Sequence, residues 1–146
     1  MDSPPSRDLK PKRKVPPPRR DAREAAVQYL YGEESGGGGP APLDAFWDLR
    51  DAKPEVREFA EQLIAGVAAH RAEIDAAIRA HLHNYTLGRV SAVDRCILRV
   101  AAYEILHADH IPPQAAINEA VEVAKRFGTE DSPRFVNGVL DKLRQG

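Results

Sequence analysis

The C-terminal segment of the chain constrains the fold most, because it predicts two helices joined by a very short loop. From residue 113 the sequence runs PQAAINEAVEVAKRFGTEDSPRFVNGVLDKL. Apolar residues recur at helical spacing in both halves of this segment. The apolar positions are Ile117, Ala120, Val121, Val123, Ala124, Phe127, Phe135, Val136, Val139, Leu140 and Leu143. Because only residues 128–132 separate the two halves, we expect a tight helical hairpin.

Local signals mark the ends of both helices. Pro113 suits a first helical turn, because its missing N–H would have no partner there. Gly128 follows the last apolar residue of the first helix, where a left-handed cap favours a residue without Cβ. Ser132 is then expected to cap the second helix, with Pro133 in its first position.

The rest of the chain also shows helical periodicity and no convincing strand alternation. One helix is expected across residues 19–31, a short one across residues 43–49, and one or two across residues 55–82. The sequence SAVD at residues 91–94 reads as a capping box, and the helix after it ends near His107. That helix is apolar on more than one face, which indicates a central position. The predicted fold class is all-α.

Composition is consistent with one domain and an unusual N-terminus. The chain has 146 residues, of which 42% are hydrophobic and 29% charged, as in ordinary soluble globular proteins. The net charge is −1, yet residues 1–20 carry seven basic and two acidic side chains, a net charge of +5. Six prolines within residues 1–18 predict a disordered tail, followed by a helical domain across residues 19–146. The tail is either a solvated extension without a role or a basic arm that attracts nucleic acid.

Metal-binding and reactive side chains are scarce. The single cysteine, Cys96, lies among apolar residues, so we expect a buried inert thiol and neither a disulfide nor a thiolate-rich metal site. His81 and His83 have no carboxylate or cysteine partner nearby in sequence, so no metal site and no cofactor are predicted. No run of about eighteen apolar residues exists, and the N-terminus lacks the apolar core of a signal peptide. We therefore expect no membrane association and a cytoplasmic location.

Three segments resemble the NusB family of bacterial transcription antitermination factors. The first is AINEAVEVAKRFGTEDSPRFVNGVLDKL, near the C-terminus. The others are VDRCILRVAAYEIL at residues 93–106 and RRDAREAAVQYLY at residues 19–31, in the family's order and spacing. The resemblance covers residues 19–143. It implies about seven helices in two packed helical subdomains, the NusB-like fold.

The resemblance implies a binding function and no enzyme activity. Family members bind boxA-type single-stranded RNA together with a ribosomal protein, NusE, and act on the RNA polymerase elongation complex during ribosomal RNA synthesis. In such a site arginines meet phosphates, and exposed side chains meet unstacked bases. The positions that match the family's RNA site are Arg19, Arg20, Arg23, Lys125, Arg126, Phe127, Glu130, Asp131 and Phe135.

Several of these positions have a competing interpretation. The arginines are expected to project from the first turns of their helix, where they oppose its dipole, but a merely solvated face would look the same. Phe135 fits the core as well as a stacking role. Tyr31 and Asp94 match the family's contacts to NusE, yet a packed tyrosine and a helix cap explain them equally well. Asp21 interrupts the arginine run where a third basic residue is common, which weakens the expected RNA site unless the basic tail compensates.

Two other functions compete with this one. The chain could be a self-associating helical adaptor, because some family members form dimers, and a homodimer could hide the RNA-binding face. A NusB-like domain also occurs in some ribosomal-RNA cytosine methyltransferases. Their catalytic domain needs a cofactor loop and a catalytic cysteine, for which we expect no room in 146 residues. The glycine run at residues 36–39 is not a phosphate loop, because the Lys-Ser/Thr pair is missing.

Overall fold

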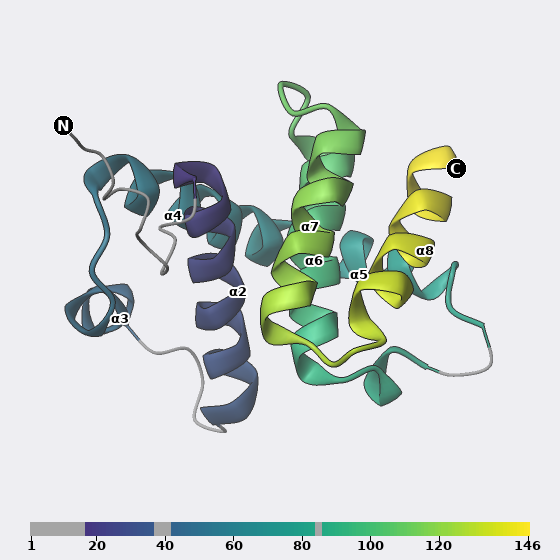
Figure 1. Ribbon diagram of the computed structural model, residues 1–146, viewed down its shortest axis with the longest axis horizontal. Coiled ribbons are helices and arrows are strands. Elements are labelled where there is room, and N and C mark those ends of the chain that lie inside the picture. The colour runs from purple at the N-terminus through teal and green to yellow at the C-terminus, as the bar shows by residue number, and fades with distance from the viewer. Residues whose placement is uncertain (1–16, 37–41, 84–85) are drawn as a thin grey trace, which may run out of the picture.

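The computed structural model describes residues 17–36, 42–83 and 86–146. These residues form seven α-helices and one 3₁₀ helix, and they contain no strand. In chain order the elements are α2 (Pro18–Gly36), α3 (Leu43–Leu49), α4 (Pro54–Ala69), α5 (Arg71–Arg79), η1 (Leu87–Arg89), α6 (Ala92–His107), α7 (Pro113–Phe127) and α8 (Ser132–Gln145) (Figure 1). The predicted all-α class is confirmed. None of the helices in these ranges is long and apolar enough to cross a membrane.

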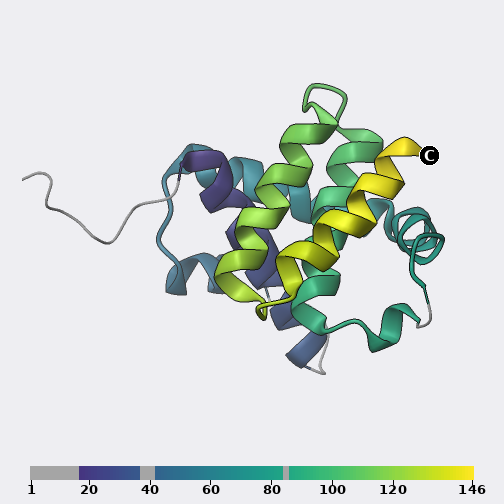
Figure 2. The same cartoon turned by 45° about the vertical axis from the view of Figure 1, so that its right-hand side comes forward.

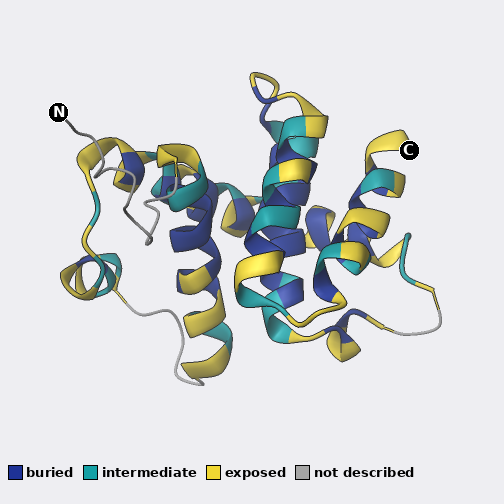
Figure 3. Ribbon diagram, viewed as in Figure 1, coloured by how far each residue is buried: buried dark blue, intermediate teal, exposed yellow. Residues whose placement is uncertain are grey.

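The helices form two packed groups that share a core. Helices α2, α3 and α4 lie on the left of Figure 1, and α5 to α8 lie on the right. Helix α6 is central, as predicted, because it packs against α2, α4, α5, α7 and α8. The largest apolar cluster draws side chains from both groups, and a smaller one around Trp47 holds α3 against α2 and α4. Figure 3 shows the buried residues gathered where these helices face one another.

The predicted hairpin is confirmed, since α7 and α8 lie side by side and join through residues 128–131 (Figure 2). Two details of its loop were predicted wrongly. Gly128 is not left-handed, because its φ is −93° and its ψ is −167°. Glycine is required there by close packing, since a Cβ on Gly128 would lie 2.4 Å from Oγ of Ser132. Ser132 does not cap α8; its Oγ accepts a 2.9 Å hydrogen bond from the Thr129 backbone N–H. The hydroxyl therefore stabilises the loop.

Most other helix ends follow the local signals. Helix α4 begins at Pro54, and the break in the long helical stretch falls at His70. Ser91 caps α6, because its Oγ accepts a 3.2 Å hydrogen bond from the Asp94 backbone N–H. Helix α2 begins at Pro18. Residues 1–16 of the expected disordered tail and residues 37–41 of the expected glycine-rich loop are outside the part of the chain that the structure describes.

Candidate nucleic-acid interface

The three arginines at the start of α2 have three different environments. Arg19 is exposed and places its guanidinium carbon 4.9 Å from the ring centroid of Phe59, on α4. Arg20 forms two hydrogen bonds to Glu119 of α7, of 2.8 and 3.0 Å. Arg23 turns into the protein. The sequence placed these residues on one helix but gave no sign of this divergence.

The expectation that Arg23 projects from α2 is wrong, because the residue is only 5% exposed. Its guanidinium group donates hydrogen bonds of 2.7–3.1 Å to both carboxylate oxygens of Glu104, on α6. A buried carboxylate is costly unless a cation pairs with it, so Glu104 requires Arg23 at this position. Arg23 therefore holds α2 against α6, and its charge does not face solvent.

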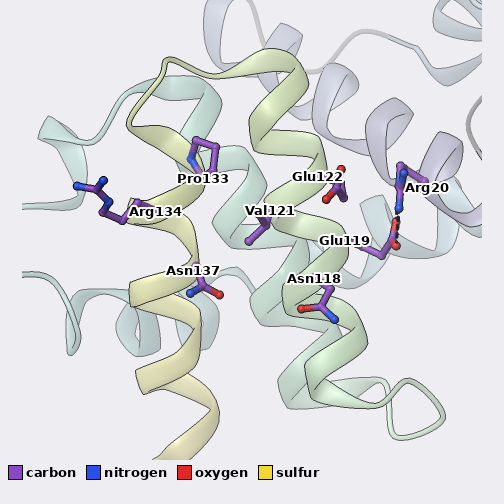
Figure 4. Close-up of a pocket in the computed structure, with 8 residues that line it drawn as sticks. All are labelled: Arg20, Asn118, Glu119, Val121, Glu122, Pro133, Arg134 and Asn137. Atoms are coloured by element: carbon purple, nitrogen blue, oxygen red, sulfur yellow. Dashed lines mark hydrogen bonds and ion pairs between the residues drawn. The ribbon is translucent and has the colours of Figure 1, made fainter. Parts of the chain in front are cut away.

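Arg20 lies at one wall of an open groove that runs along α7 between α2 and α8 (Figure 4). The groove has a volume of about 580 Å³. Its lining residues are Arg20, Asn118, Glu119, Val121, Glu122, Pro133, Arg134 and Asn137. Hydrogen bonds from Arg20 hold the pKa of Glu119 below its usual value of 4.5, so this carboxylate remains charged and partly neutralises Arg20.

Arg134, on α8, also lines the groove, although Figure 4 shows its side chain extending away from α7, and the sequence analysis missed it. The residue is exposed and has no ion-pair partner in the described part of the chain. Asn137 lies one turn further along α8 and adds an amide to the same groove. The signal was available in the sequence, because positions 134 and 137 fall on the polar side of the predicted amphipathic helix.

The basic pair at the end of α7 is exposed. Lys125 forms a 3.1 Å ion pair with Glu122. Arg126 is 3.7 Å from the Glu24 carboxylate of α2, and its guanidinium carbon lies 5.4 Å from the ring centroid of Phe127. Burial raises the pKa of Glu24, and the charge of Arg126 partly offsets this increase. Arg126 therefore joins Arg20 on the α2–α7 side of the hairpin.

The loop between α7 and α8 carries two exposed carboxylates, on Glu130 and Asp131. Asp131 occupies the N-cap position of α8 but makes no side-chain capping hydrogen bond. Phe127 and Phe135 flank the loop, and both are half-buried against the main core. Its partial burial leaves both interpretations of Phe135, packing and stacking, open.

Tyr31 and Asp94 lie on segments that the structure brings together. The Arg95 guanidinium pairs with Glu34, which joins the C-terminal part of α2 to the first turn of α6. Tyr31 precedes Glu34 by one turn and is 42% exposed. Asp94 is buried, and its Oδ1 is the one buried side-chain N or O atom without a hydrogen-bond partner in the described ranges. An unsatisfied buried carboxylate oxygen is costly, so this atom needs a donor from outside the described residues.

Two side chains singled out for other chemistry in the sequence are buried or in contact with a neighbour. Cys96 is fully buried, as predicted, and burial raises the pKa of its thiol to about 11. Nε2 of His83 lies 3.0 Å from Nζ of Lys142. We call the surface along the α7–α8 hairpin the hairpin face. It carries cations, amides and half-buried rings, which belong to Arg20, Lys125, Arg126, Arg134, Asn118, Asn137, Phe127 and Phe135.

Comparisons with known proteins assign the chain to a family. The sequence profile of the NusB family matches residues 20–145. The transcription antitermination protein NusB of Geobacter sulfurreducens is 48% identical over 128 residues, which are 86% of this chain and 92% of that protein. The solved structure of T. maritima NusB has a TM-score of 0.77 and 36% identity, and the match covers 90% of this chain and 92% of that one. A crystal structure of antitermination factors NusB and NusE in complex with dsRNA has a TM-score of 0.79 and 28% identity, covering 88% of this chain and 96% of that one. The chain belongs to the NusB family.

Proposed function

We propose that this chain is a transcription antitermination factor that binds boxA-type single-stranded RNA together with NusE and supports ribosomal RNA transcription by the RNA polymerase elongation complex. Family membership and the fold shared with the NusB–NusE–dsRNA structure support this proposal. The observation that carries its RNA part is the hairpin face, where Arg20, Arg126 and Arg134 lie along the α7–α8 hairpin that also carries two half-buried phenylalanines. Binding, without catalysis or a cofactor, is the activity.

Cations of the hairpin face contact the phosphates. Arg134 is available without rearrangement, because no carboxylate in the described ranges pairs with it. Lys125 is exposed and makes a weak surface pair with Glu122, which a phosphate can replace at little cost. Arg126 is exposed but pairs with the buried carboxylate of Glu24, so it contacts a phosphate while keeping its place beside Glu24. Arg20 must share or exchange its hydrogen bonds to Glu119. Arg19 extends the cationic surface toward α4, whereas Arg23 acts by fixing the position of α2.

Bases contact the loop and the phenylalanines beside it. Phe127 and Phe135 border the loop with half-buried rings, so we assign them to contacts with unstacked bases. The carboxylates of Glu130 and Asp131 would repel phosphates, so we propose that they accept hydrogen bonds from base edges and ribose hydroxyls. This arrangement favours a single strand, because only its bases are free to turn toward the protein.

NusE binds the surface around Tyr31 and Asp94. Tyr31 supplies an exposed ring, and Oδ1 of Asp94, which is buried in the free chain, becomes accessible on binding and accepts a hydrogen bond from the partner. Asp94→Asn keeps the backbone N–H that Ser91 uses to cap α6, so it should preserve the melting temperature and weaken NusE binding while leaving RNA binding alone unchanged. A large fall in melting temperature with normal affinity for NusE would show that Asp94 is structural only.

One titration tests the RNA proposal. The purified chain is titrated with a boxA-like single strand, a scrambled single strand and a duplex of the same sequence, each with and without NusE, at one stated salt concentration. We expect the boxA-like strand to bind best and NusE to increase its affinity. Replacing Arg134 by Ala should flatten the slope of log affinity against log salt by roughly 0.7, the value for one lost phosphate contact with a single strand. Equal affinity for all three RNAs would refute boxA recognition.

The mass of the protein in the same titration tests self-association. A homodimer that covers the hairpin face should dissociate as RNA is added, whereas a monomer should gain only the mass of the RNA. A dimer that persists at RNA saturation uses another surface and leaves the hairpin face available.

A further inference from the structure

A cluster of two histidines and one glutamate lies away from the hairpin face, where α4, α5 and α6 meet. His70 is the single residue between α4 and α5, Glu73 lies in the first turn of α5, and His107 ends α6. Nε2 of His107 is 3.0 Å from Oε1 of Glu73, and Nδ1 of His70 is 3.8 Å from the same oxygen. One potential ligand atom from each residue lies within 4.8 Å of the others. Each of the three ligands comes from a different segment.

The backbone and an aromatic stack hold this cluster in place. The His70 N–H donates to the Gly66 carbonyl, and the His70 carbonyl accepts from the Ile74 N–H, so the residue is anchored to both helices. The rings of His70 and His107 are stacked, with centroids 3.7 Å apart and an interplanar angle of 18°. The ring of Tyr103 stacks beside them, with its centroid 6.1 Å from that of His70 and 5.9 Å from that of His107.

Gly66 makes room for this stack. A Cβ on Gly66 would lie 2.2 Å from Cζ of Tyr103, so only glycine lets the Tyr103 ring lie this close to α4. The packing of α4 on α6 therefore places the backbones of His70 and His107 side by side. Arg71 follows His70 in sequence but pairs with Asp75, 3.4 Å away, so its charge has a separate partner.

We propose that His70, Glu73 and His107 form a binding site for a divalent transition metal ion, with Zn²⁺ as the best fit. Two imidazole nitrogens and one carboxylate oxygen are ligands that Zn²⁺ accepts, and water completes the coordination. Zn²⁺ bonds of about 2.0–2.2 Å place tetrahedral ligand atoms roughly 3.3–3.5 Å apart. The 3.0 and 3.8 Å separations at Glu73 bracket that spacing.

Metal binding requires a modest rearrangement of side chains. A histidine binds metal in the plane of its ring, so the two stacked imidazoles must turn apart until both nitrogens point at the ion. The side chain of Glu73 is 57% exposed and that of His70 is 40% exposed, so both have room to move. By binding both His70 and His107, the ion would link the junction of α4 and α5 to the end of α6. We therefore expect it to stabilise the contact between the two helix groups.

Zn²⁺ binding to the untagged full chain, measured by calorimetry, tests the site. We expect one equivalent to bind and the melting temperature to rise until that equivalent is saturated. Glu73→Gln should weaken binding by more than about tenfold, because losing even an outer partner of a ligand costs that much. Glu73 is exposed, so this change should leave the metal-free melting temperature unaltered. His107→Asn should abolish binding, and Co²⁺ should show visible absorption only in the native chain.

Variants at the two histidines of the His81–His83 pair provide the matched control. His81→Ala with His83→Ala removes the same number of imidazoles from another surface, and it should leave Zn²⁺ affinity unchanged. The proposal is overturned if the native chain binds no Zn²⁺, or if this double variant loses binding. It is also overturned if Glu73→Gln and His107→Asn both bind as tightly as the native chain.

Discussion

Arg23 of α2 and Glu104 of α6 form a bidentate ion pair that is almost completely buried, although 81 residues separate them in the chain. The side chains are 6% and 1% exposed, and the closest nitrogen–oxygen distance is 2.7 Å. The pair joins α2 of one helix group to α6 of the other. Arg19 and Arg20 lie in the preceding turn of α2, where Arg19 contacts the ring of Phe59 and Arg20 pairs with Glu119.

Breaking this pair should destabilise the fold. Arg23→Ala leaves the Glu104 carboxylate buried without a cation, which should lower the free energy of unfolding by about 3–5 kcal/mol. Arg23→Met combined with Glu104→Leu removes both charges and should be more stable than either single variant. Urea denaturation measures all of these values. Arg19→Ala is the matched control, because this arginine is exposed, and it should change stability little. A stable Arg23→Ala variant would show that the pair is dispensable.

A second ion network gives the fold a defined sensitivity to acid. Hydrogen bonds from Arg95 and Arg99 hold the pKa of Glu34 below its usual value of 4.5. Arg99 also pairs with Asp75, 2.9 Å away, so the network joins α2, α5 and α6. Because the unfolded chain takes up a proton at Glu34 first as the pH falls, the stabilisation is complete above pH 4.5 and is lost below it.

Glu34→Gln should therefore lower the free energy of unfolding near neutral pH. Acidification should then lower the free energy of unfolding of this variant less than that of the native chain. The difference in free energy of unfolding between the native chain and this variant should shrink as the pH falls below about 4.5. Denaturation at a series of pH values measures this difference. Glu130→Gln, at an exposed carboxylate of the loop, should show no such trend. A constant difference for Glu34→Gln at all pH values would contradict the assignment.

The sequence predicted the helices well because their ends depend on local signals. Pro113, Pro133 and Ser91 act through the backbone of their own first turns, and the structure places each in such a turn or cap. Apolar periodicity likewise identified the central helix α6. Gly128 shows the limit of such signals. Its position was expected, but the reason for glycine is a contact with Ser132, which no local pattern reveals.

The candidate sites were predicted less completely because they depend on contacts between distant segments. Arg23 looked like its neighbour Arg20 in sequence, and only the Glu104 carboxylate on α6 distinguishes a core residue from a surface one. Arg134 was missed because its importance arises from the groove that α8 forms with α2 and α7. The proposed metal site was missed for the same reason, since His107 lies 34 residues from Glu73 in the chain.

Glu119 should limit the RNA affinity of Arg20. Its carboxylate accepts from Nε and Nη2 of Arg20, two of the nitrogens that Arg20 would offer to a phosphate. Glu119→Gln weakens this competition and removes a negative charge from the groove, so it should increase RNA affinity and steepen the dependence of affinity on salt. The effect should vanish when Arg20 is replaced by Ala. Titrations at several salt concentrations measure both variants, and an unchanged slope in Glu119→Gln would remove Arg20 from the site.

Phe135 allows packing and stacking to be separated. Its ring is half-buried against the main core, so Phe135→Ala should both destabilise the fold and weaken RNA binding. Phe135→Leu is more informative, because leucine fills much of the buried space but has no aromatic face. If Phe135 stacks on a base, this variant should lose about 1–3 kcal/mol of RNA affinity. Its slope of log affinity against log salt should stay the same, because no phosphate contact is removed.

Stability and RNA affinity of Phe135→Leu should be measured on the same preparation, with Phe127→Leu beside it. Phe127 is half-buried on the other side of the loop, so the pair shows which ring meets a base. A native melting temperature with weakened binding assigns stacking to the substituted residue. If Phe135→Leu binds RNA as tightly as the native chain, Phe135 contributes only to packing. The bases would then have to meet Phe127 or the polar side chains of the groove.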